Sequence, residues 1–250
     1  MSTRTRRALR ALSSVLIISG VLMLADAGLT LAWQEPVSGV YSWIVQDRLD
    51  GDLRELERAA PSRIEQRALR TLEGDRRRMA FLARALKCTA DRGDAVGRIR
   101  IPRIDASYVV VDGTDGASLR KGPGIYDQTP FPGAPGTVAI AGHRTTYAAP
   151  FHDIDELRRK DEVTVEMPYG RFSYEVEKTR IVAPSELSVI RRVSHDRLVL
   201  SACHPLYSAA KRIIIFARLV QAEPRGPAKA ARVGVPVSAA DVPRTGRGSP

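Results

Sequence analysis

Apolar positions change their spacing along the chain, and each change marks a different kind of segment. An apolar run fills residues 11–33, about the length of a helix that crosses a bilayer. Helical spacing follows from Gln46 to Lys87. After Asp94 the spacing becomes strand-like and remains so until about Gln221. The pattern therefore predicts an apolar helix, a helical stalk and a mainly β domain, in that order.

The β domain is predicted to be compact and to contain few helices. Alternating or continuous apolar runs predict seven strands, at residues 96–101, 107–111, 137–141, 161–167, 171–182, 197–202 and 212–220. Short helices are predicted at 116–121 and 151–158, with loops elsewhere. The run Ile213 to Phe216 is apolar on both faces, so its strand should be central. Seven strands in about 125 residues indicate a barrel or a sandwich.

These patterns divide the chain into five segments. We expect a cytoplasmic basic segment, a transmembrane anchor, a helical stalk that spaces the domain from the membrane, the β domain, and a disordered tail rich in proline and glycine; the bounds are 1–10, 11–33, 34–94, 95–221 and 222–250. Four arginines before the apolar run favour a cytoplasmic N-terminus. A cleaved signal peptide is the alternative, since Ala25-Asp26-Ala27 imitates a cleavage site. Under either reading, the β domain lies outside the cytoplasm.

The net charge of +11 does not describe the whole chain evenly. Seven of these charges lie in the first ten and the last 29 residues. A nucleic-acid-binding protein is expected to carry a basic face on a folded module, usually with a recognisable reading element. The sequence offers no such element, so we expect no nucleic-acid partner.

The chain has two cysteines, Cys88 and Cys203, which in an exported protein raises the possibility of a disulfide. Cys88 lies in the segment leading to the β domain, whereas Cys203 ends a predicted strand within it. One bridge between linker and core would be an unusual constraint for a domain of this size. We therefore expect two unpaired thiols.

Cys203 has partners suited to nucleophilic catalysis. A cysteine nucleophile needs access, a proton donor or acceptor, and positive charge near the developing oxyanion. His143 follows the apolar strand at 137–141, and Arg212 follows Cys203 by nine residues at the start of another strand. Each residue taken alone has a structural reading: a small buried cysteine, a loop histidine and a solvated arginine. Together they predict a cysteine-based site at one end of the sheet.

Other histidines are weaker candidates. His204 neighbours Cys203 and should point to the opposite face of an extended chain. His143, Cys203 and His204 lack a paired ligand spacing such as Cys-x-x-Cys, so we expect no metal site and no cofactor.

The order of these motifs resembles the sortase family, and class E sortases most. The resemblance covers roughly Gly97 to Val220. It rests on Gly142-His-Arg-Thr-Thr-Tyr147 after one apolar strand, Ser201-Ala-Cys-His-Pro205 after another, and Arg212. The loops Gly122-Pro-Gly-Ile-Tyr126 and Pro132-Gly-Ala-Pro-Gly136 contribute to it.

The resemblance implies a closed β-barrel of seven to eight strands in which Cys203, His143 and Arg212 are catalytic. It implies a cysteine transpeptidase that cleaves a Leu-x-x-Thr-Gly-type sorting motif near the C-terminus of exported proteins. The acyl group would pass to an amine, such as a peptidoglycan precursor or a pilin lysine. The alternatives are a cysteine endopeptidase that uses water and an inactive membrane-tethered scaffold.

Substrate contacts are expected at Tyr147, Ala202 and Ser201. By resemblance to class E, Tyr147 favours alanine over proline at the second motif position; alternatively its ring simply packs at the barrel rim. The chain departs from the family twice. Val199-Leu-Ser-Ala202 replaces the usual Thr-Leu-x-Thr before the cysteine, and Ala148 replaces a typical glycine. Both departures concern substrate positioning.

Overall fold

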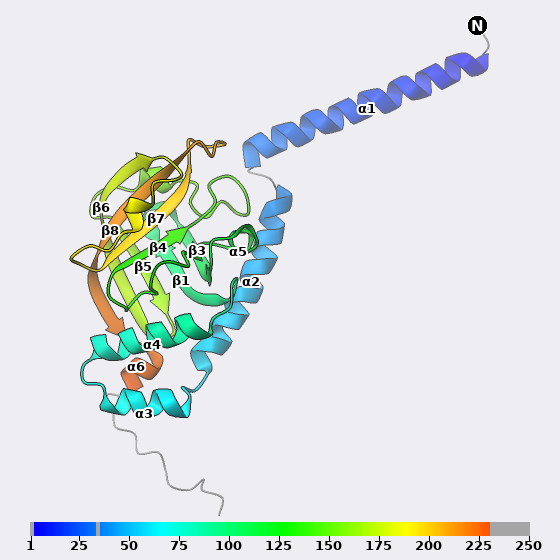
Figure 1. Ribbon diagram of the computed structural model, residues 1–250. Coiled ribbons are helices and arrows are strands. Elements are labelled where there is room, and N and C mark those ends of the chain that lie inside the picture. The colour runs from blue at the N-terminus through cyan, green and yellow to red at the C-terminus, as the bar shows by residue number, and fades with distance from the viewer. Residues whose placement is uncertain (1–2, 34–35, 231–250) are drawn as a thin grey trace, which may run out of the picture.

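A computed structural model describes residues 3–33 and 36–230, with side chains for 10–28 and 39–230. Its centre is a closed barrel of eight strands, in the order β1-β2-β3-β4-β7-β8-β6-β5 (Figure 1). The strands are β1 (Ala95–Ile101), β2 (Ala106–Asp112), β3 (Gly124–Ile125), β4 (Thr137–Ala141), β5 (Glu162–Met167), β6 (Gly170–Val182), β7 (Arg197–His204) and β8 (Lys211–Pro224). The expected mainly β barrel is confirmed.

Two of the eight neighbouring strand pairs are parallel. β2 pairs with β3, and β4 pairs with β7, in parallel, while the other pairs are antiparallel. Since parallel neighbours need a long crossover, β4 and β7 are joined in sequence by the excursion through β5 and β6. This excursion brings segments about sixty residues apart into one local sheet. The closed order leaves no free edge strand.

All seven predicted strands are present, within two residues at most of their bounds, apart from the longer end of β8. Strand β3 was missed because two residues, Gly124 and Ile125, are too few to show a period. The predicted helix at 116–121 is α5 (Gly116–Lys121). Its first N–H groups donate to the Asp115 side chain, which acts as the N-cap.

The helix predicted at 151–158 is wrong. Only a 3₁₀ turn, η2 (Ile154–Glu156), forms there. Phe151, Ile154 and Leu157 are buried at a spacing of three, which fits a 3₁₀ turn as well as an α-helix. The N–H groups of Ile154 and Leu157 donate to the carbonyls three residues earlier, which is the 3₁₀ pattern.

The barrel interior holds the main core cluster. Alternate side chains of each strand point inward, such as Leu198 and Leu200 on β7 and Ile213 and Ile215 on β8. A second cluster lies on the outer face of the same strands and is covered by the loop that contains η3 (Leu187–Ile190); its buried members are Ala139, Val182, Val189, Val199, Ile214 and Phe216. The central strand β8 is therefore buried on both faces, as predicted.

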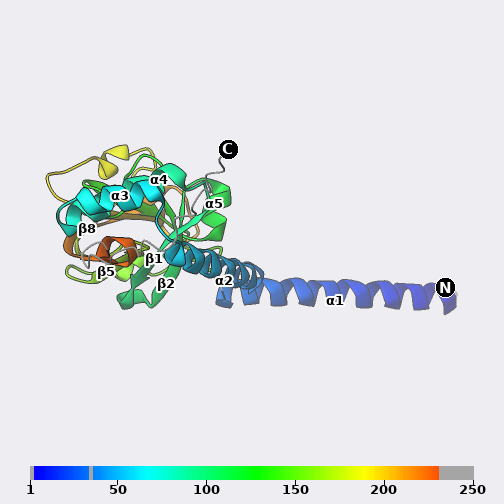
Figure 2. The same ribbon diagram turned by 90° about the horizontal axis from the view of Figure 1, so that it is seen from below.

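The segment expected to be a stalk is helical but does not stand apart from the barrel. It forms α2 (Pro36–Arg58), α3 (Arg63–Thr71) and α4 (Asp75–Thr89). Leu49 and Leu53 of α2 pack with β1 and β2, and Met79 and Leu82 of α4 join the main core cluster. Figure 2 shows α3 and α4 lying over the barrel. These helices are part of the domain, because their apolar stripes have no other surface on which to be buried.

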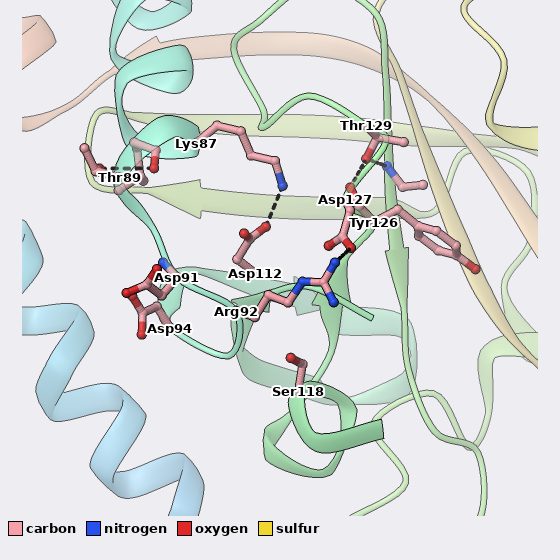
Figure 3. A network of polar contacts seen from close by, with 12 residues as sticks. Lys87, Thr89, Asp91, Arg92, Asp94, Asp112, Ser118, Tyr126, Asp127 and Thr129 are labelled. Atoms are coloured by element: carbon pink, nitrogen blue, oxygen red, sulfur yellow. Dashed lines mark hydrogen bonds and ion pairs between the residues drawn. The ribbon is translucent and has the colours of Figure 1, made fainter. Parts of the chain in front are cut away.

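Polar contacts fix α4 to the strands (Figure 3). Lys87 at the end of α4 lies 2.6 Å from the Asp112 carboxylate at the end of β2. Three residues after α4 ends, Arg92 lies 2.6 Å from Asp127. Asp112 is 6% exposed, and a carboxylate so buried is costly to leave unpaired. The pairs therefore set where the chain enters β1.

Two other expectations concern the ends of the chain. The expected tail at 222–250 is partly wrong, because β8 continues to Pro224 and α6 (Gly226–Ala230) follows it. Ala228 is fully buried in the main core cluster. Residues 231–250 lie outside the described part of the chain.

At the N-terminal end, α1 (Thr3–Trp33) projects away from the barrel in both views (Figures 1 and 2). Its stretch Arg10–Gly28 is long and apolar enough to cross a membrane.

If α4 belongs to the core, shortening a buried side chain on it must destabilise the barrel. Met79 is 1% exposed, so Met79→Ala should lower the free energy of unfolding by about 2–5 kcal/mol. Ile64 on α3 is 79% exposed, so Ile64→Ala is the matched control and should change it by less than about 0.5 kcal/mol. Urea unfolding of the full chain in detergent, followed by far-UV circular dichroism, measures both. Equal, small effects would mean that α4 is a detached spacer.

Candidate active site

Strand pairing places the three predicted catalytic positions side by side at one end of the barrel. Cys203 pairs directly with Arg212 across β7 and β8. On the other side of β7, Ala141 pairs with Ser201, and the next N–H, that of Gly142, donates to the Ser201 carbonyl at 3.0 Å. This pairing extends the β4 register past its last residue. His143 therefore follows at the level of Cys203.

The pleat of the strands decides which face these side chains occupy. Ala202 packs in the main core cluster, and Val199 packs in the outer one. Side chains alternate along a strand, so Cys203 lies on the outer face and His204 on the inner face. By the same rule Arg212 shares the outer face with Ile214. The site is thus on the outside of the barrel, next to the outer apolar cluster, and its three members are half-buried.

The loop after β4 is shaped by close packing and by an unusual backbone. A Cβ on Gly142 would come within 2.6 Å of the Phe151 ring, so only glycine fits before His143. Tyr147, Ala148 and Ala149 all have positive φ angles, of 51°, 59° and 41°. Such left-handed residues each cost about 1–2 kcal/mol when they are not glycine. The Tyr108 hydroxyl donates to the Ala148 carbonyl at 3.1 Å and helps to hold this turn.

This turn places the Tyr147 ring against the imidazole. The ring centroids of His143 and Tyr147 are 5.2 Å apart, and Tyr41 of α2 lies 6.4 Å from Tyr147, edge to face. Tyr147 therefore lies beside His143, and its predicted contact with substrate stays a prediction. Ala202 and Ser201 are 3% and 5% exposed, so their side chains are covered in this structure. They support the nucleophile from within the sheet.

Burial lowers the pKa of His143 below its ordinary value, and the positive charge of Arg120 on α5 lowers it further. Both effects disfavour the imidazolium. The contribution of Arg120 had no signal in the sequence, because α5 lies more than twenty residues before His143. Only the closure of the barrel brings the two together.

Arg212 is tied to its own loop. Its Nη1 donates to the carbonyls of Ala209 and Lys211, at 2.9 and 3.0 Å. Those bonds hold the guanidinium against the loop between β7 and β8, and no described contact uses its Nη2, which leaves part of the planar donor fork available. Cys203 and Cys88 are both free thiols. In the described part of the chain, no group of three His, Cys, Asp or Glu residues could hold a metal ion.

Comparisons with known proteins agree with this geometry. Residues 99–220 match the sequence model of the sortase domain. The protein belongs to the sortase family. The match begins within β1 and ends within β8, so it spans the barrel and includes Cys203, His143 and Arg212.

Relatives of two sortase classes are similar to the chain. Sortase D of Bacillus subtilis is 36% identical over 135 residues, which cover 52% of this chain and 66% of that protein. Sortase SrtE1 of Streptomyces coelicolor is 26% identical over 153 residues, covering 55% of this chain and 44% of that one. The expected likeness to class E is confirmed, with a likeness to a class D sortase at higher identity. The chain spans less than two thirds of either relative.

Among solved structures, the Sortase D5 transpeptidase of Clostridium perfringens superposes with a TM-score of 0.57. It is 22% identical, and the match covers 71% of this chain and 99% of that one. At this identity the likeness concerns the fold. The sortase barrel is therefore supported by both sequence and shape.

The left-handed turn after His143 predicts a stabilising substitution. Ala148→Gly removes the steric cost at φ 59° and should raise the free energy of unfolding by about 0.5–1 kcal/mol, after the entropy of glycine in the unfolded chain is counted. Ala90→Gly is the control, because Ala90 has an ordinary φ of −71°. That change should instead lower the stability by a similar amount. Denaturant unfolding gives both changes in the free energy of unfolding. If the two substitutions change it in the same direction, the turn is not strained.

The charge of Arg120 predicts the direction in which the His143 titration moves. In the parent protein, the His143 pKa measured by NMR should lie below 6.5. Arg120→Gln removes a positive charge that opposes protonation, so the pKa should rise toward its ordinary value. Lys229→Gln on α6 removes an equal charge from another element and should leave the pKa of His143 unchanged. A fall in the Arg120→Gln variant would contradict the assigned cause.

Proposed function

We propose that this sortase is a membrane-anchored cysteine transpeptidase. The observation that carries the proposal is the register that sets Cys203 opposite Arg212 and continues β4 toward His143 at the same level. A thiol, an imidazole and a guanidinium on one face supply a nucleophile, a proton carrier and an oxyanion donor. The match of residues 99–220 to the sortase domain supports the same reaction class, since sortases are cysteine transpeptidases.

In the proposed reaction, the Cys203 thiolate attacks the carbonyl carbon of the threonine in a Leu-x-x-Thr-Gly-type motif. Arg212 donates hydrogen bonds to the oxyanion of the tetrahedral intermediate. Protonated His143 gives its proton to the glycine amine as the C–N bond breaks, which leaves a thioester on Cys203. His143 then accepts a proton from the incoming amine, the new amide bond forms, and the thiolate leaves.

The substrates would be exported proteins whose sorting motif lies near the C-terminus. The acceptor would be a peptidoglycan amine, which attaches the protein to the cell wall, or a lysine of a pilin subunit. The first 33 residues support placement at the membrane, since α1 contains an apolar stretch with exposed side chains. Arginines before this stretch favour a cytoplasmic N-terminus and an extracellular barrel.

Tyr147 is the side chain we propose for contact with the second motif position. Its ring lies beside His143, where a bound peptide would pass on the outer face. Ser201 and Ala202 would act through the main chain and through packing, since their side chains are covered. A preference for alanine over proline at this position is the corresponding expectation.

Thiol variants of the full chain in detergent test the reaction. Each is incubated with Leu-Ala-x-Thr-Gly and Leu-Pro-x-Thr-Gly peptides and with triglycine, and products are identified by mass spectrometry. Cys203→Ala should abolish turnover, whereas Cys88→Ala, which removes the other free thiol, should stay within about twofold of the parent. Arg212→Lys should lose about 10²–10³-fold in kcat, because an ammonium cannot reproduce the planar fork.

The products separate the alternatives. Cleaved peptide that never carries triglycine would indicate an endopeptidase in which water resolves the thioester. Absence of thioester and product in the parent, with Cys203→Ala indistinguishable from it, would indicate an inactive scaffold.

A further inference from the structure

Arg144 is the least exposed of the buried charged side chains that the structure describes, although it directly follows His143. It is 2% exposed, compared with 6% for Asp112 and 8% for Glu166. A guanidinium so buried needs partners for its donors, because an unpaired buried charge is strongly destabilising. Its partners therefore show which segments the side chain connects.

One group of partners lies in the segment around η2. The Arg144 Nε donates to the His152 carbonyl at 3.0 Å, and its Nη2 lies 2.7 Å from Asp155. A second hydrogen bond joins the same two residues, since the His152 Nδ1 donates to the Arg144 carbonyl at 2.7 Å. Arg144 is thereby fixed at both its main chain and its guanidinium.

The other partners are at the nucleophile. The Arg144 Nη1 donates to the main-chain carbonyl of Cys203 at 3.5 Å and lies 3.4 Å from the Nδ1 of His204. His204 is on the inner face of β7, opposite to the face of the Cys203 thiol. The guanidinium thus lies beneath the site and connects the loop that carries His143 to the strand end that carries Cys203.

The contact with His204 has a chemical consequence. Arginine has five N–H donors and no acceptor. The Nδ1 of His204 can only accept in this contact, so the proton of the neutral ring must be on Nε2. Arg144 therefore selects one tautomer of the residue that follows the nucleophile.

We propose that Arg144 is a positioning residue for the reaction at Cys203. It fixes the Cys203 main chain relative to His143 and holds His204 as the Nε2–H tautomer. It does not touch the reacting atoms, and acts through the geometry of the groups that do. The kinetic part rests on the proposed transpeptidase function, whereas the tautomer and the accessibility of the thiol do not.

Arg144→Lys and Asp155→Asn test the proposal in the full chain. Lysine keeps the charge but cannot reach the His152, Asp155 and Cys203 oxygens together. Its kcat with the motif peptide should fall about 10–100-fold with KM within about twofold, since small displacements of reacting groups cost factors of this size. Asp155 is half-exposed, so Asp155→Asn should fold and should lose only about 3–10-fold, because one anchor of Arg144 weakens.

Lys87→Gln is the matched control for stability. It breaks the 2.6 Å pair with Asp112 on strand β2, which is three places away from β7 around the barrel. It should lower the melting temperature while leaving kcat unchanged. If both variants lose kcat in the same proportion to their loss of stability, then Arg144 is merely structural and the proposal fails.

Two readouts stay independent of turnover. Nitrogen-15 NMR of the His204 ring should show only the Nε2–H tautomer in the parent and a mixture of both tautomers in Arg144→Lys. Alkylation of Cys203 by iodoacetamide, in a Cys88→Ala background, should slow about 3–10-fold in the same variant. A parent His204 with its proton on Nδ1, or unchanged alkylation in Arg144→Lys, would overturn the proposal. A parent that alkylates as expected but transfers no peptide would instead count against the proposed function.

Discussion

The site depends on how strand β7 is held between two neighbours of opposite direction. β4 runs parallel to it and pairs with it as far as Ser201, whereas β8 runs antiparallel and pairs with it as far as His204, in both cases without a register shift. A shift of one residue in either pair would turn Cys203, Arg212 or both to the barrel interior, because side chains alternate across a strand. The inward packing of Leu198, Leu200 and Ala202 prevents that shift. The packing of the core thus decides which face of the sheet each reactive side chain occupies.

The same strand end has different surroundings on its two faces. The outer face carries a thiol, an imidazole and a guanidinium next to an apolar cluster. The inner face carries His204 and the buried guanidinium of Arg144, anchored to the segment at 152–155. A buried cation is tolerated there because carbonyls and a carboxylate surround it. Rigid support on one face allows the exposed groups on the other to keep a fixed geometry.

The helices before the barrel connect the site to the N-terminal segment. α2 packs on β1 and β2, and its Tyr41 meets the Tyr147 ring that lies against His143. α4 contributes to the main core cluster and is held by the ion pair between Lys87 and Asp112. These helices are therefore integral to the domain. A spacer would need a polar surface all round, which the buried leucines of α2 and α4 exclude.

Local sequence signals predicted most of the elements and named the reactive groups that we propose. Period-two patterns located seven strands, and the apolar run at 11–33 predicted the N-terminal helix, since both signals are local. Gly-His-Arg and Ala-Cys-His after apolar strands, with Arg212 nine residues on, gave the family resemblance. The contacts that connect these groups could be seen only in the folded chain. These contacts join segments that are separated in the chain. They include the pairing of the two-residue strand β3, the docking of α2 and α4, the effect of Arg120 on His143, and the contacts of Arg144 with Cys203 and His204. Their geometry comes from barrel closure, a long-range pairing that leaves no periodic trace in any single segment.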